Sequence, residues 1–309
     1  MSGIKTQEHS TGGWLNGFIG VLIFSGSLPA TRIAVKEMDP LFLTAGRAVI
    51  AGLLALVMLW RFKEKRPARQ QLLPLFLVAV GGVIGFPLLS AWALQYITSA
   101  HAIVFLGLLP LSTAVFGVMR GGERPGAVFW VFSVAGSLLV AGYAAADGLS
   151  GNPVGDLLML LAVLVCGLAY AEGALLSRTM GGWQVISWAL VLSLPVMLAL
   201  LLWYWPAPMT MAAVSPAAWT SLAYVGVFSM FVGFIFWYRG LAQGGIAAVG
   251  QLQLLQPLFG LALAAVLLHE DVSISMLGIT LGVMICVAGS RRFARRKPAL
   301  PAGLQGNDR

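Results

Sequence analysis

Long apolar stretches, separated by short polar segments, recur along the whole chain of 309 residues. A helix needs about 20 mainly apolar residues to cross the hydrocarbon core of a membrane, and lipid-exposed backbone must close its hydrogen bonds within each segment. The stretches are too long for membrane-barrel strands, which need only about ten alternating residues. We therefore predict ten transmembrane helices, over residues 14–35, 41–60, 72–96, 99–119, 126–146, 154–177, 183–204, 217–238, 246–268 and 272–290.

The composition points to the same class of protein. Hydrophobic residues make up 59% of the chain and charged residues only 10%, whereas a soluble domain carries about 25% charged residues. Since so few charges cannot cover that much apolar surface in water, the sequence predicts an all-α integral membrane protein. Cys166 and Cys286 lie within apolar stretches and indicate neither a disulfide framework nor a metal site. We expect no metal and no cofactor.

The distribution of charge predicts an orientation. The net charge is +8 and the pI is 9.9, which in a soluble protein would suggest a nucleic-acid partner. With the N-terminus placed in the cytoplasm, however, all 19 Lys and Arg residues except Arg32, Lys36 and Arg47 fall in inner loops and tails. This is the asymmetry of multi-pass proteins, whose cytoplasmic loops are rich in Lys and Arg. We predict a cell-membrane (inner or plasma membrane) protein with both termini cytoplasmic, a first helix that is retained and no nucleic-acid partner.

An internal repeat divides the chain into two halves. Residues match at a constant offset of 147, and the end of the first helix matches that of the sixth more loosely, Lys36 with Arg178. Each half holds five predicted helices, and an odd number forces the second copy to enter the membrane upside down. We predict a cytoplasmic tail over 1–13, inverted-topology five-helix repeats over 14–146 and 154–290, and a basic cytoplasmic tail over 291–309. The matched pairs are Leu94 and Leu241, Ala100 and Ala247, Pro110 and Pro257, Glu123 and Glu270, and Gly142 and Gly289. Simple duplication without a transport role is the alternative.

Both halves resemble the EamA repeat of the drug/metabolite transporter superfamily. In the first half the resembling residues are Leu94 to Ala100, Leu109-Pro110 and Gly122-Glu123-Arg124-Pro125; in the second they are Gly240-Leu241-Ala242, Gln256-Pro257 and His269-Glu270. Arg47 also resembles the family pattern of the second helix, while Asp271 departs from the pattern by standing where the first half has Arg124. The resemblance implies ten helices around a central cavity, and a substrate that is an amino acid, a related metabolite or a drug-like molecule. Many relatives are exporters.

Polar and aromatic residues within the spans are the candidates for the cavity wall. Gln253 and Gln256 share a helix face because they lie three residues apart, and amides can recognise polar groups without the cost of a buried charge. Glu172 could bind a substrate ammonium group or carry a proton. The full set of cavity candidates is Gly26, Phe86, Ser90, Phe105, Tyr170, Glu172, Phe234, Trp237, Gln253 and Gln256.

Each of these assignments has a structural alternative. The glutamines can hydrogen-bond neighbouring helices, and Glu172 can reach the interface or pair with Arg178. Pro110 and Pro257 are expected to kink the fourth and ninth helices, either as gating bends or as packing kinks. Arg32 and Arg47 are expected to form an ion-pair cluster at the outer rim with Glu37 and Asp39.

These features predict a secondary transporter, working as an exporter by alternating access at a cavity between the repeats. The partners are a small-molecule substrate and the lipid bilayer. With no ATPase motif in the sequence, the driving force is a gradient of substrate, protons or another ion. A polytopic membrane enzyme or a channel or scaffold is the alternative. The spans hold no nucleophile–base set for an enzyme and no ring of repeated polar residues for a channel, so we expect no enzymatic activity.

Overall fold

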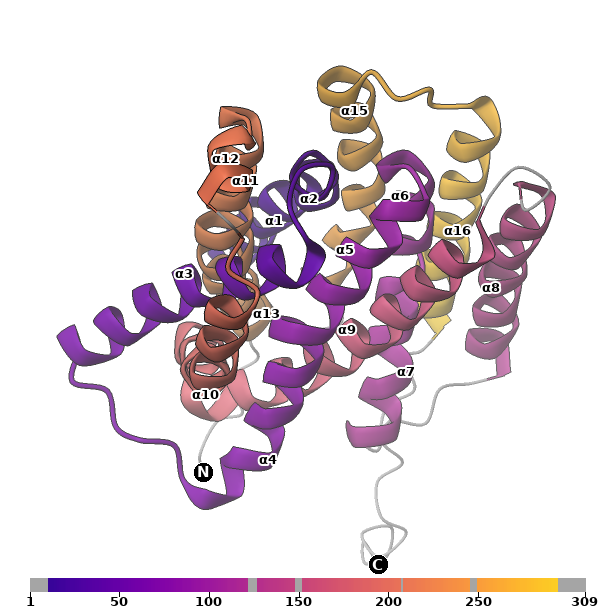
Figure 1. Ribbon diagram of the computed structural model, residues 1–309. Helices are drawn as coiled ribbons and strands as arrows, with labels where there is room; N and C mark the ends of the chain where they lie inside the picture. Colours follow the sequence, from indigo (N-terminus) through magenta and orange to yellow (C-terminus); the bar gives the residue numbers. More distant parts are fainter. Residues whose placement is uncertain (1–10, 122–126, 148–151, 207, 245–248, 294–309) are drawn as a thin grey trace, which may run out of the picture.

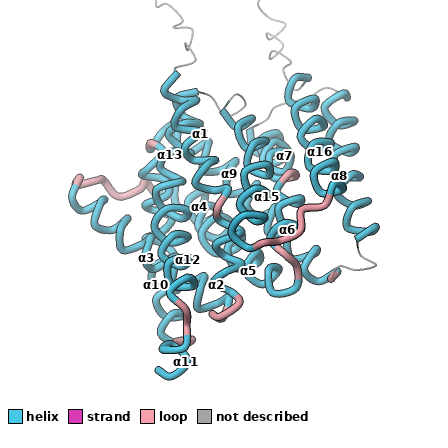
Figure 2. Tube along the Cα trace, turned by 90° about the horizontal axis from the view of Figure 1, so that it is seen from above, coloured by secondary structure: helices cyan, strands magenta, loops and turns pink. Residues whose placement is uncertain are grey.

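The computed structural model describes residues 11–121, 127–147, 152–206, 208–244 and 249–293, and across these ranges the chain is helical without any strand (Figures 1 and 2). Seven helices in the described part are long and apolar enough to cross a membrane. They are Gly12–Val35, Pro40–Arg61, Arg69–Tyr96, Ser99–Arg120, Pro153–Met180, Gly182–Trp203 and Pro216–Leu241. The chain is therefore a multi-pass α-helical membrane protein, as its composition predicts.

The first half begins with α1 and α2, which are separated at Gly26. The start of α3 follows from its sequence: Asp39 accepts from the backbone N–H groups of Leu41 and Phe42, and Pro40 fits the first helical position because its missing N–H would be unpaired there. The elements are α1 (Thr11–Ser25), α2 (Ser27–Val35), α3 (Pro40–Arg61), α4 (Arg69–Val78), the π-helical turn η1 (Ala79–Gly85), α5 (Phe86–Tyr96), α6 (Ser99–Leu106), α7 (Leu109–Gly121) and α8 (Ala127–Asp147).

The second half begins with α9, a helix of 28 residues that turns directly into α10. Gly181 makes this turn at φ +95°, a left-handed conformation that glycine adopts without strain. The elements are α9 (Pro153–Met180), α10 (Gly182–Trp203), α11 (Pro208–Ala213), α12 (Pro216–Ala223), the π-helical turn η2 (Tyr224–Val232), α13 (Gly233–Gly244), the 3₁₀ turn η3 (Gly250–Leu255), α15 (Gln256–Leu268) and α16 (Ile274–Phe293).

Several helices predicted as continuous are interrupted, which corrects the simple spans. The helix predicted over 14–35 breaks at Gly26, and that over 99–119 breaks after Leu106. The helices predicted over 72–96 and 217–238 contain η1 and η2, which end at Gly85 and Val232, 147 residues apart. Because π turns are rare and concentrate at functional sites, their equivalent placement marks these two helices as important.

Helices from the two halves pack against each other. In both views α3 lies along α10 and α1 along α13, while α8 and α16 form one edge of the molecule (Figures 1 and 2). Small residues allow the closest approach: a Cβ on Gly20 of α1 would lie 3.1 Å from the backbone of Trp237 in α13. The packing repeats with the halves exchanged, since α9 lies against α5 as α1 lies against α13.

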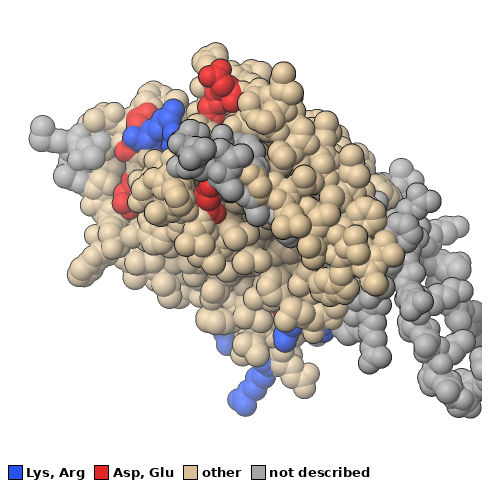
Figure 3. Space-filling model, turned by 90° about the vertical axis from the view of Figure 1, so that its right-hand side faces the viewer, with Lys and Arg blue, Asp and Glu red and all other residues tan. Residues whose placement is uncertain are grey.

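Charged side chains gather at opposite ends of the helices. Asp and Glu occupy one end, with a few basic side chains beside them, and other Lys and Arg project from the far end (Figure 3). The Glu123 match of the repeat and the tail segments 1–10 and 294–309 lie outside the described residues.

Candidate functional site

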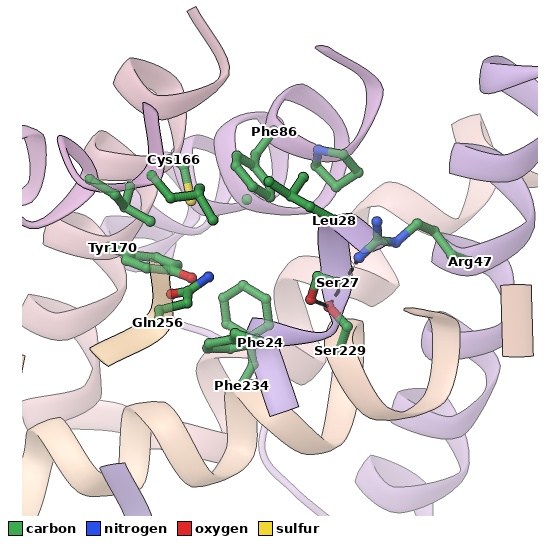
Figure 4. A pocket seen from close by; sticks show the side chains of 14 residues that line it. Phe24, Ser27, Leu28, Arg47, Phe86, Cys166, Tyr170, Ser229, Phe234 and Gln256 are labelled. Atoms are coloured by element: carbon green, nitrogen blue, oxygen red, sulfur yellow. Dashed lines mark hydrogen bonds between the residues drawn. The ribbon is translucent and has the colours of Figure 1, made fainter. Parts of the chain in front are cut away.

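A pocket lies among the helices, with residues of both halves in its wall (Figure 4). The pocket is nearly closed in this structure, because the space inside it that a water-sized molecule can occupy is about 20 Å³, room for about one water. The lining residues are Phe24, Ser27, Leu28, Arg47, Gly82, Phe86, Pro87, Leu106, Leu109, Cys166, Tyr170, Ser229, Phe234 and Gln256. Two of its contributors, Gly82 and Ser229, belong to the π turns η1 and η2.

Aromatic rings form the middle of the pocket. The rings of Phe24 and Phe234 meet edge to face, with centroids 5.1 Å apart. Tyr170 stacks on Phe24 at 6.5 Å and meets Phe234 edge to face at 5.8 Å. The indole of Trp237 packs against Phe24 and Tyr170 from outside the lining, at 6.3 and 6.0 Å. The cluster joins α1, α9 and α13, so a ligand here would contact both halves.

A polar group lies at one side of the pocket. Arg47 Nη2 donates to Ser229 Oγ at 3.2 Å, and the hydroxyls of Ser229 and Ser27 lie 2.7 Å apart. Arg47 is only 4% exposed, and its Nε has no hydrogen-bond partner among the described residues. The rim cluster predicted for Arg32 and Arg47 is wrong, because Asp39 caps its own helix α3 and Glu37 binds Ser215. Arg32 lies beside Glu270 instead.

Four of the predicted cavity residues, Phe86, Tyr170, Phe234 and Gln256, line this pocket. The predicted residue Gly26 lies outside the lining, against the ring of Tyr224. The remaining three of the small and aromatic candidates also lie outside it: Ser90 donates to Pro87 O at 3.1 Å, Phe105 packs on His101 at 5.8 Å between centroids, and Trp237 packs behind the aromatic rings.

Glu172 lies outside the lining and has a different partner from those considered in the sequence. Its buried carboxylate, 3% exposed, accepts from Arg120 Nε at the end of α7. Arg178 forms no ion pair with it in the described residues, because Glu172 faces α7. Gln253 is also buried, 2% exposed, and neither atom of its amide has a hydrogen-bond partner in the described structure.

The two prolines lie where helices restart. Pro110 is the second residue of α7, which follows the break after α6. Pro257 is the second residue of α15, which follows the 3₁₀ turn η3. Proline fits the first turn of a helix, where its missing donor costs nothing. The bends at these points place Leu109 and Gln256, the residues just before the prolines, in the pocket wall.

Acidic residues tie helices together at the end opposite Arg120. Glu270 accepts from Ser99 N, Ser99 Oγ and Ala100 N at 3.1, 2.7 and 2.8 Å, and Arg32 Nε lies 4.0 Å from its carboxylate. His101 and Asp156 meet at 2.7 Å.

Glu37 makes a further tie at this end. It accepts from Ser215 N at 2.6 Å and from Ser215 Oγ at 2.7 Å. These two hydrogen bonds, first the backbone one and then the hydroxyl one, lower the pKa of the Glu37 carboxyl below its usual 4.5, because they favour its charged form.

Most of the pocket wall was missed in the sequence. Arg47 stands out in the sequence as a charge within a span, but the prediction assigned it to the outer rim. Ser27 and Ser229 give no local signal, since a Ser within an apolar helix usually bonds its own backbone. The repeat offset of 147 could have found others: it pairs Leu109 with Gln256, both of which line the pocket, and Leu106 of the lining with Gln253.

Comparison with known proteins adds independent findings. Residues 11–143 and 153–291 each match the model of the EamA-like transporter family. The uncharacterized transporter YdeK of Bacillus subtilis (strain 168) is 64% identical over 289 residues, 94% of this chain and 100% of that protein. A probable terminal-alkyne amino-acid exporter of Streptantibioticus cattleyicolor is 24% identical over 291 residues, 92% of this chain and 95% of that protein. A crystal structure superposes with a TM-score of 0.65 at 19% identity, covering 92% of this chain and 99% of the other, which is a likeness of fold.

Proposed function

Because the chain belongs to the EamA-like transporter family, which matches it over both halves, we propose that it is a secondary transporter that exports small organic molecules. The proposed cargo is an amino acid, a related metabolite or a drug-like compound. The observation that carries the proposal is the composition of the pocket wall. Nine lining residues come from the first family match and five from the second, so relative movement of the halves would change access to the pocket.

The proposed mechanism is alternating access by two inverted five-helix repeats, with ten crossings in all. Three observations support this arrangement. The two π turns end at equivalent positions of the halves. The packing of α1 on α13 is repeated by α9 on α5. Acidic and basic side chains gather at opposite ends (Figure 3), which is the charge distribution expected when both termini are cytoplasmic.

The proposed direction is outward. It is supported by the relative from Streptantibioticus cattleyicolor, which is described as a probable exporter of a terminal-alkyne amino acid. The proposed energy source is a gradient of the substrate, of protons or of another ion. For a proton, Glu172 is the candidate carrier because its carboxylate is buried within α9 and paired with Arg120.

Counterflow in proteoliposomes tests the proposal. Purified full-length protein is reconstituted, the vesicles are loaded with an unlabelled compound from a screen of amino acids and drugs, and uptake of the labelled compound is followed. A carrier gives a transient, saturable overshoot. Flux that rises linearly with concentration and shows no overshoot would indicate a channel, and chemical conversion of the compound would indicate an enzyme.

Proton coupling is tested separately with Glu172→Gln. If Glu172 carries the proton, the variant keeps counterflow but loses the dependence of transport on pH. A variant whose transport depends on pH as the unmodified protein's does removes Glu172 from the coupling.

A further inference from the structure

The guanidinium of Arg47 is buried among membrane helices and has no counter-ion in the part of the chain that the structure describes. It is the one charged side chain among the residues that line the pocket, and no carboxylate of the described residues pairs with it. A charged side chain within a membrane span is costly, and such residues normally face a cavity and pair with an opposite charge. Arg47 faces the cavity and lacks the opposite charge.

The nearest acidic residues in the sequence are engaged elsewhere. Asp39 accepts from the first N–H groups of α3, and Glu37 accepts from Ser215 at the start of α12. Neither carboxylate can neutralise Arg47 without giving up these bonds. The missing charge is therefore most simply supplied by a ligand in the pocket.

The groups around Arg47 suit a carboxylate. Its guanidinium presents a planar fork of donors that matches the two oxygens of a carboxylate, and its Nε has no partner within the described segments. The hydroxyls of Ser229 and Ser27, joined at 2.7 Å, lie beside it; one of their two hydrogens makes that bond, and the other can be donated to a carboxylate oxygen. A single cation favours a group of one negative charge over a phosphate dianion, which would exceed it.

The other residues of the pocket indicate what kind of group the rest of the ligand would be. In the close view, Phe24 and Phe234 lie between the Arg47 side and the opposite side, where Tyr170 and Gln256 lie (Figure 4). Rings at this spacing suit an apolar or aromatic group, and the phenol and amide can hydrogen-bond a polar group beyond it. The described residues of the lining include no Asp or Glu to receive an ammonium group.

We infer that Arg47, Ser27 and Ser229 form the anion subsite of the pocket, and that the substrate is a monocarboxylate with an apolar or aromatic body. The inference rests on the proposed function, because it takes this pocket as the substrate site. It deepens that proposal by naming the group that the transporter recognises and the residue that recognises it.

Binding of matched probes to purified protein in nanodiscs tests the subsite. The probes are 3-phenylpropionate, the neutral 3-phenylpropan-1-ol, the zwitterion phenylalanine and phenyl phosphate, with short aliphatic monocarboxylates beside them. We expect a monocarboxylate to bind saturably and more tightly than the alcohol, the zwitterion and the phosphate. We expect Arg47→Gln to weaken carboxylate binding by about ten- to a hundredfold, the size of a lost charged hydrogen bond, and Arg47→Lys to weaken it less. Arg178→Gln, which removes an exposed charge at the end of α9, is the control and leaves binding unchanged.

Two binding results would overturn the inference: equal carboxylate affinity in the unmodified protein and Arg47→Gln, and no saturable binding of any monocarboxylate. Stability without ligand is a further test. Since Arg47 has no counter-ion among the described residues, Arg47→Met is expected to melt at or above the temperature of the unmodified protein. A lower melting temperature than that of Arg178→Met would make Arg47 structural. If a cargo without a carboxylate shows counterflow that Arg47→Gln does not change, the transporter proposal stands and the anion subsite is contradicted. If monocarboxylates bind but no compound shows counterflow, the anion subsite stands and the transporter proposal is contradicted.

Discussion

Arg120, at the exposed end of α7, donates from Nε to the buried carboxylate of Glu172 in α9. The pair joins two helices 52 residues apart in sequence, and its two members differ in environment: the Arg120 side chain is 46% exposed and that of Glu172 only 3%. Removing the arginine would leave a carboxylate buried and unpaired, whereas removing the carboxylate would leave an arginine that water can still reach.

This asymmetry predicts unequal effects of the two single substitutions. Arg120→Gln should destabilise the protein by about 1–2 kcal/mol, because an unpaired buried charge is costly although solvent screens part of the interaction. Glu172→Gln should cost less, and the double variant should recover most of the stability lost in Arg120→Gln. Thermal melting in detergent of the unmodified protein, the two single variants and the double variant completes a double-mutant cycle. Additive losses in the double variant would show that the two side chains do not stabilise each other.

Glu270, in the connection between α15 and α16, binds the first turn of α6. Its carboxylate accepts from two backbone N–H groups, those of Ser99 and Ala100, and from the Ser99 hydroxyl. The first N–H groups of a helix have no partner within it, and an acceptor there stabilises the helix. Glu270→Ala should therefore cost about 1–2 kcal/mol, the usual loss for a helix cap. Asp271→Asn, the exposed neighbour, is the control and should change the melting temperature little; an equal loss in both variants would assign the effect to net charge.

The contact of α1 with α13 leaves no space for a side chain at Gly240. A Cβ there would lie 2.6 Å from the backbone nitrogen of Gly17, and backbone cannot move aside as a flexible side chain can. Gly240→Ala should destabilise the protein by about 1–3 kcal/mol, as overpacking does. Gly117→Ala in α7 is the matched control, because a Cβ there would meet nothing within 4 Å, and Ala favours the helix by up to about 1 kcal/mol. A Gly240→Ala protein with the same melting temperature as the unmodified protein would contradict this packing.

The extent of most helices could be predicted from the sequence. The span predicted over 183–204 is α10, Gly182–Trp203, and α3 begins where Asp39 and Pro40 predict. The breaks could not be predicted in the same way, because η1 and η2 lie in apolar runs without a residue type that demands a π turn. The hydrophobicity of a segment determines whether it can cross the membrane, whereas its packing against neighbouring helices determines where its backbone departs from a regular α-helix.

The residues of the candidate site also fall into those that the sequence predicts and those that depend on tertiary packing. Tyr170, Phe234, Phe86 and Gln256 were predicted, because aromatic and polar residues within spans are conspicuous. Arg47 was placed with Glu37 and Asp39 by closeness in sequence, but helix starts claim both carboxylates. Asp39 binds the first N–H groups of its own helix, whereas Glu37 binds Ser215, which the tertiary structure brings near. The partner of Glu172, Arg120, also comes from a distant helix and could not be read from the sequence around Glu172.

Gln253 carries two buried polar atoms that have no partner in the described residues. A buried amide that makes no hydrogen bond costs about 1–3 kcal/mol, so Gln253→Leu should leave the melting temperature equal or higher. Gln71→Leu is the contrasting control, because Gln71 Oε1 accepts from Ala68 N at 2.9 Å and its loss should be mildly destabilising. If the amide of Gln253 pairs with cargo or with another helix during transport, counterflow should fall in Gln253→Leu despite the unchanged stability. A destabilised Gln253→Leu would show that the amide has a structural partner instead.

Cys166 offers a native reporter for opening of the pocket. It lies in the pocket wall and is buried, so a thiol reagent reaches it only when the helices part. In Cys286→Ser, which leaves Cys166 as the one thiol of the chain, N-ethylmaleimide should react slowly in the resting protein and at least about tenfold faster during counterflow, since reaction needs exposure of the thiolate. In Cys166→Ser the remaining Cys286, which lies on α16 outside the pocket, should react at the same rate in both conditions. Alternating access requires that counterflow speeds the modification of Cys166 and leaves that of Cys286 unchanged. Equal rates for Cys166 at rest and during turnover would mean that cargo moves without this pocket opening.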